Sequence, residues 1–211
     1  IRVGQIPYLQ GKVAEFTKKV RGGRNVLPND VWNAITTTIM KTLEYPMSAT
    51  TIDKKAWDTI MRPLLRTCLP IAGYSRNFPH AVLYGPTQQG GKGLMHPWYN
   101  QELTHLQLFW EEVAAETHNG ELLMTSLEEL RLELGFSGTL TSVPYVRMEK
   151  CATDSWLTSL WETCCRWNID IADPSPRLTP ARIYDVFIME AFAANPDLTD
   201  EDLRVLNECR C

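Results

Sequence analysis

Cationic side chains in the first half of the chain are the residues best suited to chemistry. Arg62 and Arg66 lie four residues apart on one predicted helix, and Lys55 precedes them on it. Downstream, the cations Arg76, His80 and Lys92 are interleaved with the aromatic residues Tyr74, Phe78, Tyr84 and Trp98. Cations bind phosphates and flat side chains stack on unpaired bases, so this mixture suits a strand of nucleic acid. From these residues alone, an equally good interpretation is that the aromatics pack a loop onto the core while the cations are solvated.

The chain divides after His96 into two segments of opposite charge. Residues 1–96 contain 13 lysines and arginines against 5 aspartates and glutamates, a balance of +8. Residues 97–211 contain 8 against 20, a balance of −12, and together the segments give the net charge of −4. A polyanion would be attracted to the basic segment and repelled by the acidic one. Ordinary variation in solvated surface charge is the alternative explanation.

The glycine-rich stretch 85–93 invites comparison with a phosphate-binding loop but has the wrong residue order. That loop requires lysine directly after its second glycine, followed by a serine or threonine that holds magnesium. Here Gly91 intervenes before Lys92, Gly93 takes the hydroxyl position, and Pro86 removes a backbone donor. We therefore do not expect nucleotide hydrolysis. A loose phosphate contact through Lys92 and the flanking glycine amides stays open.

No other cluster of residues predicts catalysis or metal binding. Adjacent glutamates at 111–112 and 128–129 lie opposite leucine stripes, which is typical of solvated helix faces. Asp170 and Asp173 lack nearby oxygen ligands, so a turn is the better interpretation. The six cysteines form no C-x-x-C pair, and the four histidines lack metal-ligand spacing. We predict no catalytic residue, metal or cofactor in this segment, and the cysteines favour a reducing intracellular compartment.

Apolar residues recur at intervals of three and four, which predicts a mainly α-helical multi-helix bundle. A first helix is expected over residues 7–20, and a second from Pro28 to a stop at Pro46. A third begins after Asp53, which is a suitable N-cap, and carries the two arginines.

Residues 69–98 contain many prolines and glycines and predict one long ordered loop. Within this loop, residues 81–84 alone are typical of a short strand or extended segment, so the fold is expected to contain at most a short strand pair. We expect Phe78 or Tyr84 to anchor the loop to the core. A long ordered loop usually serves a function.

The acidic segment predicts further helices. Leucine and tryptophan repeats predict helices over about 103–113, 119–135 and 156–164, the second of them starting near Asn119 and ending at Gly135. No apolar run approaches the roughly 18 to 20 residues that a membrane span needs.

Near the end of the chain, a proline-rich linker is expected at 173–180, followed by a helix carrying Ile183 and Phe192. A last helix is expected to begin at Thr199, with Asp202 at the capping-box position. The organisation expected is a basic part, 1–96, and an acidic part, 97–211, or one continuous domain. We expect the chain to be a piece of a longer polypeptide, truncated at both ends.

Several segments match one known family in order and spacing. They are 41–46 (Lys-Thr-Leu-Glu-Tyr-Pro), 49–51, 76–86 (Arg-Asn-Phe-Pro-His-Ala-Val-Leu-Tyr-Gly-Pro), 93–94, 122–123, 126–128, 130–135, 152–156 and 187–192. These segments resemble the region downstream of the polymerase core in reverse transcriptases of non-long-terminal-repeat-type retroelements, notably multicopy ones from protists and fungi. The resemblance covers most of the chain from Lys41 to Arg210, whereas residues 1–40 match less well.

The resemblance implies an RNA-directed DNA polymerase with fingers, palm, thumb and a helical continuation. In such enzymes, the aspartates of a Tyr-x-Asp-Asp turn in the palm bind two magnesium ions. This chain lacks that turn, because Tyr184-Asp185 is followed by Val186. The resemblance therefore implies a thumb-like segment that is inactive alone. Its partners would be the absent palm domain, which holds the magnesium, and an RNA/DNA template–primer.

We therefore expect a non-catalytic segment that contacts template and primer, located in the nucleus or cytoplasm and without a membrane partner. The residues expected to contact phosphates are Lys55, Arg62, Arg66, Arg76 and Lys92. The main alternative is a helical protein-interaction scaffold with no nucleic-acid role. A self-contained small-molecule enzyme is a third class, which a pocket containing two titratable groups would favour.

Overall fold

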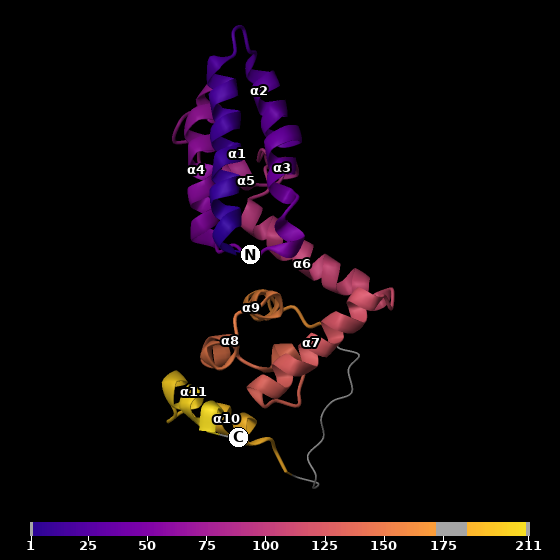
Figure 1. Cartoon of the computed structure of the whole chain (residues 1–211). Coiled ribbons are helices and arrows are strands. Elements are labelled where there is room, and N and C mark those ends of the chain that lie inside the picture. Colours follow the sequence, from indigo (N-terminus) through magenta and orange to yellow (C-terminus); the bar gives the residue numbers. More distant parts are fainter. Residues whose placement is uncertain (1, 172–184, 210–211) are drawn as a thin grey trace. The chain divides into compact units, whose positions relative to one another are not determined.

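The computed structural model describes residues 2–171 and 185–209. Over these residues the chain is mainly α-helical and forms no strand, which confirms the predicted fold class. The chain forms two compact units, Ile1–His105 and Leu106–Cys211 (Figure 1). By sequence, the first has 13 lysines and arginines against 6 acidic residues and the second 8 against 19, so we call them the basic unit and the acidic unit.

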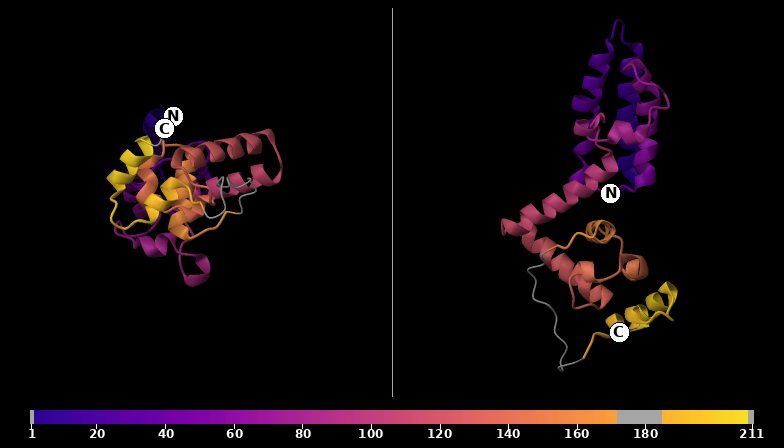
Figure 2. Two further views of the ribbon diagram at one scale, coloured as in Figure 1. Left: turned by 90° about the horizontal axis from the view of Figure 1, so that it is seen from below. Right: turned by 180° about the vertical axis from the view of Figure 1, so that it is seen from behind.

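The basic unit is built from helices joined by short turns. Its elements are α1 (Arg2–Gly22), α2 (Pro28–Ala34), a π-helical segment (Ile35–Ile39), α3 (Met40–Glu44), a 3₁₀ turn (Met47–Ala49), α4 (Lys54–Ile71), α5 (His80–Tyr84), a second 3₁₀ turn (Thr87–Gln89) and the start of α6 (Pro97–Ala114). Helix α1 packs along α4, as Figures 1 and 2 show from several sides. The predicted first helix is confirmed, and it extends beyond the expected range at both ends.

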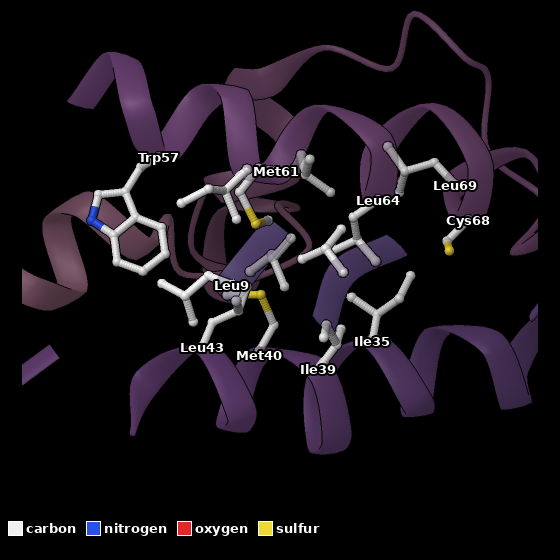
Figure 3. Close-up of a cluster of buried hydrophobic side chains, with 14 of the residues drawn as sticks. Leu9, Ile35, Ile39, Met40, Leu43, Trp57, Met61, Leu64, Cys68 and Leu69 are labelled. Atoms are coloured by element: carbon white, nitrogen blue, oxygen red, sulfur yellow. The ribbon is translucent and has the colours of Figure 1, made fainter. Parts of the chain in front are cut away.

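The helical stretch from Pro28 to Glu44 contains a π-helical turn that keeps one apolar row on the core side. Val31, Ile35, Ile39 and Leu43 are spaced by four residues, and in a regular α-helix each such step rotates the row by about 40°. The wider i→i+5 turn at Ile35–Ile39 compensates for this rotation. All four side chains are buried. Figure 3 shows Ile35, Ile39 and Leu43 facing α4 across the core.

Helix α4 starts where the sequence predicts. The carboxylate of Asp53 accepts a hydrogen bond from the amide of Ala56 at 2.7 Å and so caps the first turn. The helix buries one face in the core, comprising Trp57, Ile60, Met61, Leu64, Cys68 and Leu69. Figure 3 shows Trp57, Met61 and Leu64 on this face. It runs past residue 69, the expected start of the loop, and ends at Ile71. Gly73 then adopts a left-handed φ of 87°, which lets the Tyr74 amide reach the Leu69 carbonyl at 2.9 Å.

The predicted strand at residues 81–84 is wrong. These residues belong to α5, in which the amides of Val82 and Leu83 donate to the Pro79 carbonyl at 3.0 and 2.9 Å. Leu83 is the one buried residue of this helix, so the alternation of buried and exposed positions that a strand needs is missing. The rest of the loop is held by backbone hydrogen bonds, such as those from Lys92 to the Val82 carbonyl at 2.8 Å and from Leu94 to the Leu83 carbonyl at 3.1 Å.

The acidic unit has its own core and contains the end of α6. Its further elements are α7 (His118–Leu134), a 3₁₀ turn (Leu140–Ser142), α8 (Tyr145–Met148), a 3₁₀ turn (Glu149–Cys151), α9 (Trp156–Trp167), α10 (Ile188–Ala194) and α11 (Asp200–Cys209). The core centres on Trp161, which is fully buried and donates its indole N–H to the Val143 carbonyl at 3.0 Å. Among the described residues, no helix of either unit is both long and apolar enough to cross a membrane.

Helix ends in the acidic unit follow the predicted signals. Gly135 ends α7 with a left-handed φ of 71°. Thr199 and Asp202 form the expected capping pair, since the Thr199 amide donates to Asp202 at 2.9 Å and the Asp202 amide donates to the Thr199 hydroxyl at 3.2 Å. The expected linker at 173–180 and Ile183 lie outside the described residues.

Candidate nucleic-acid interface

A groove of about 650 Å³ lies in the basic unit between α4, α5 and the start of α6. Its lining combines cations with aromatic rings. The lining residues are Lys54, Asp58, Met61, Arg62, Leu65, Arg66, Arg76, His80, Ala81, Tyr84, His96 and Tyr99. All of them belong to the basic unit.

Helix α4 supplies the longest wall of the groove. Asp58, Arg62 and Arg66 follow one another at four-residue intervals, so they share one face of the helix. This face adjoins the one that packs in the core, and the burial of that core face fixes the rotation of α4. Arg62 and Arg66 are therefore exposed at the groove, whereas the neighbouring residues Met61, Leu64 and Cys68 are buried in the core.

The groove collects three of the five predicted phosphate-binding residues. Arg62, Arg66 and Arg76 line it. Lys55 is exposed on α4, seven residues before Arg62, which places it close to the same helix face but outside the groove lining. Lys92 also lies outside the lining, and its Nζ lies 4.8 Å from the centroid of the Tyr74 ring. The predicted cations are therefore divided between two places in the fold: the groove, which the arginines line, and the Tyr74 ring, which Lys92 contacts.

The two expected loop anchors both contact the hydrophobic core of the basic unit. Phe78 and Tyr84 are partly buried against it. The Phe78 ring lies 5.1 Å from that of Tyr74, whereas Tyr84 packs edge to face against His96 at 5.0 Å between ring centroids. Tyr84 thus combines an anchoring position with a place in the groove wall. Burial, reinforced by the charge of Asp58, raises the pKa of Tyr84 to about 12.

His96 lies beneath the groove and is only 5% exposed. Its Nδ1 accepts a hydrogen bond from the Trp98 amide at 3.2 Å, so the ring proton of the neutral imidazole resides on Nε2. Nε2 lies 3.0 Å from Oδ1 of Asp58 and donates to it. Burial lowers the pKa of His96 despite the nearby carboxylate, which keeps the ring neutral near pH 7.

The groove cations are not neutralised by the protein. Within the described parts of the chain, no carboxylate oxygen lies within 4.0 Å of a side-chain nitrogen of Arg62, Arg66 or Arg76. Asp58 is the one acidic side chain among the described residues of the lining, and it pairs with His96 instead. An anionic ligand could therefore bind these guanidinium groups without breaking an existing ion pair.

The glycine-rich stretch does not form a phosphate cradle, because its amides are used within the loop. Gly91 donates to the Pro86 carbonyl at 3.0 Å, Lys92 to the Val82 carbonyl at 2.8 Å and Gly93 to the Gly85 carbonyl at 2.8 Å. A Cβ atom at Gly91 would collide with the Gly85 carbonyl, so glycine is required here for close packing of backbone. The amides of Gly91, Lys92 and Gly93 are therefore already paired within the loop.

The pair Asp58 and His96 brings two titratable groups together in one groove, which is the arrangement that would favour an enzyme. Both imidazole nitrogens of His96 are already engaged, with Trp98 and with Asp58, so the ring offers no free lone pair for use as a general base. The described lining also contains no serine, threonine or cysteine nucleophile. Among the described residues, no group of three or more histidines, cysteines or acidic residues is arranged to hold a metal ion.

Sequence reasoning missed Lys54, Asp58, His96 and Tyr99. Lys54 and Asp58 were detectable, because they continue the four-residue spacing of Arg62 toward the start of the helix. His96 and Tyr99 reach the groove only through the path of the loop, and no local pattern marks them. Comparisons of the chain with protein-family models, curated proteins and solved structures give no match.

Proposed function

We propose that the basic unit binds the phosphate backbone of nucleic acid through Arg62, Arg66 and Arg76. The observation that carries this proposal is the convergence of three guanidinium groups, free of carboxylate partners among the described residues, on one groove. Guanidinium groups bind phosphates through paired, charge-assisted hydrogen bonds. The aromatic residues of the lining add the flat surfaces that nucleic-acid sites commonly contain.

A polyanion suits this surface better than a single small phosphate. Lys55, Arg62 and Arg66 mark a positive line along α4 that extends about 16 Å at 1.5 Å per residue. A strand with regularly repeated phosphates would contact several of these cations at once, whereas a small anion would contact few.

The sequence resemblance supports a more specific proposal. In it, the chain is a non-catalytic segment of a retroelement RNA-directed DNA polymerase that contacts the template and primer. The palm domain of the same polypeptide would be its covalent partner and would hold the catalytic magnesium. The whole polypeptide would then act inside the cell, in the nucleus or cytoplasm.

Binding of a fluorescein-labelled RNA–DNA hybrid, measured by anisotropy at several salt concentrations, tests the proposal. We expect salt-dependent binding that weakens on the order of tenfold or more when Arg62→Glu and Arg66→Glu are combined. The control is Lys18→Glu combined with Arg21→Glu, which makes the same charge change on exposed positions of α1 outside the groove. Equal loss in both double variants, or no binding by the folded wild-type chain, would contradict the proposal.

A helical interaction scaffold is the second candidate, and exposed apolar residues of the acidic unit favour it. Trp110, Leu122, Leu132 and Trp167 are each at least 50% exposed. A contiguous apolar patch marks a surface that meets another protein, and these four side chains are candidates to belong to one. This candidate predicts no affinity for nucleic acid.

A further inference from the structure

Asp58 is an unusual residue for a groove that binds phosphates. It is the one carboxylate among the described lining residues, and its side chain is 53% exposed. Lys54 and Arg62 lie four residues before and after it on α4, the spacing at which ion pairs form on a helix. Yet neither cation lies within 4.0 Å of its carboxylate oxygens in the described structure. Asp58 therefore forms no ion pair with either of these two cations of α4.

The orientation of Asp58 is set from beneath by His96. Because Nδ1 of His96 accepts from the Trp98 amide, Nε2 must donate, and it does so to Oδ1 of Asp58 at 3.0 Å. Over the described residues, no hydrogen bond is formed to the second oxygen, Oδ2. A buried imidazole thus fixes a half-exposed carboxylate that has one acceptor oxygen left for a ligand.

An ionised carboxylate accepts hydrogen bonds and repels phosphates, so a ligand that suits both Asp58 and the arginines must carry donors close to its phosphates. In a nucleic-acid strand the available donors are the 2′-hydroxyl of ribose and the N–H groups of the bases. The 2′-hydroxyl is present at every ribonucleotide beside the backbone, whereas base donors change with sequence. It is also the group by which proteins distinguish RNA from DNA.

We propose that Asp58, held by His96, accepts a hydrogen bond from a ribose 2′-hydroxyl and so makes the groove select RNA strands over DNA strands. This inference rests on the proposed function, because the arginines must first bind the backbone. Lys54 and Arg62, four residues to either side of Asp58, would hold phosphates adjoining the selected ribose.

The test measures binding of the full chain to labelled 12-mers of oligouridylate, of its deoxy form and of its 2′-O-methyl form. These strands share bases and phosphates, and only the first carries the 2′-hydroxyl donor. We expect RNA to bind about tenfold more tightly than the other two, which is the lower end of the range for a hydrogen bond to a charged group. Asp58→Ala should reduce this ratio to near one, mainly by strengthening the binding of the deoxy strand.

Asp30→Ala is the matched control, because it removes the same carboxylate from an exposed helix position outside the groove. It should leave the ratio of RNA to DNA affinity unchanged. Circular dichroism and urea unfolding of Asp58→Ala establish that it is folded, and Asp58→Asn, which retains the size of the side chain, provides a second variant. In Asp58→Asn the ratio should also fall.

The outcomes separate the two proposals. If the wild-type chain binds all three strands equally, the role of Asp58 is disproved while backbone binding stands. The role is likewise disproved if both variants retain the RNA preference. If no strand binds to the folded chain, the proposed function itself fails.

Discussion

Gln101 on α6 and Trp57 on α4 are joined by a hydrogen bond of 3.2 Å, from the indole N–H to the side-chain carbonyl. The same glutamine also accepts from the Ile52 amide at 3.1 Å and donates to the Ile52 carbonyl at 3.0 Å. Gln101 is 2% exposed, so three polar groups of two other residues depend on it for partners. This contact ties the start of α6 to the start of α4 and thereby supports the groove between them.

Gln101→Leu should destabilise the basic unit by about 3 kcal/mol, because it leaves buried polar groups without partners. Urea unfolding followed by tryptophan fluorescence and circular dichroism measures this change. Gln107→Leu, at an exposed position of the same helix, is the control and should change the stability by less than about 0.5 kcal/mol. Similar losses in the two variants would show that the Gln101 hydrogen bonds are not important for stability.

The arginines and lysines of the basic unit should differ in their effect on salt dependence. Arg76→Ala should reduce the slope of log K against log salt for nucleic-acid binding by about 0.7 to 0.9, the contribution of one phosphate contact. Lys92→Ala should leave the slope unchanged, since its Nζ lies over the Tyr74 ring and outside the groove. A slope that falls equally in both variants would argue for diffuse attraction to the whole basic surface.

The stability of the basic unit should depend on pH through His96 and His105. Burial lowers the pKa of both imidazoles below the usual value of 6.5, so the unfolded chain binds protons more readily than the folded chain. The free energy of unfolding should therefore decrease as the pH falls below about 6.5, and level off below the folded pKa values.

Denaturant unfolding between pH 5 and pH 8 measures this dependence. His105→Gln should flatten the profile, while retaining a side-chain donor toward the Met47 carbonyl that Nε2 of His105 contacts at 2.8 Å. Gln107→Asn, which changes an exposed side chain that does not titrate, should leave it unchanged. A wild-type profile that is flat across this range would contradict the predicted effect of histidine burial.

The cysteines should differ sharply in reactivity. Burial raises the thiol pKa of Cys68 to about 11 and, with contributions from Cys165 and Asp170, that of Cys164 to about 12. In the folded chain at pH 8, iodoacetamide should modify the exposed Cys209 and leave Cys68 and Cys164 unmodified. Peptide mass spectrometry before and after addition of urea checks this, and rapid modification of Cys164 without urea would contradict its burial.

Helices were predictable from the sequence wherever local patterns agree with packing. The cap at Asp53, the glycine at 135 and the pair Thr199 and Asp202 act within a few residues, so their effects are visible in the sequence. The segment 81–84 was misassigned because its residue types favour strands, whereas Pro79 and a single buried contact at Leu83 make it helical.

The groove was predictable only in part, for a related reason. Arg62 and Arg66 share one helix, and their spacing alone places them together. Asp58 and His96 are 38 residues apart and meet only because the loop returns to α4. The same loop path places Lys92 over the Tyr74 ring. Lys92 therefore lies outside the groove, although it follows Arg76 in the same loop.

The π-helical turn at Ile35–Ile39 has a consequence for changes in chain length. Deleting one of the three threonines that follow Ile35 would leave apolar residues at spacings of four, three and four, the pattern that a regular α-helix uses to keep one face in a core. A homologue with this single-residue deletion would therefore retain the whole core of the basic unit. The turn therefore marks a position where one residue can be deleted inside a helix without loss of the fold.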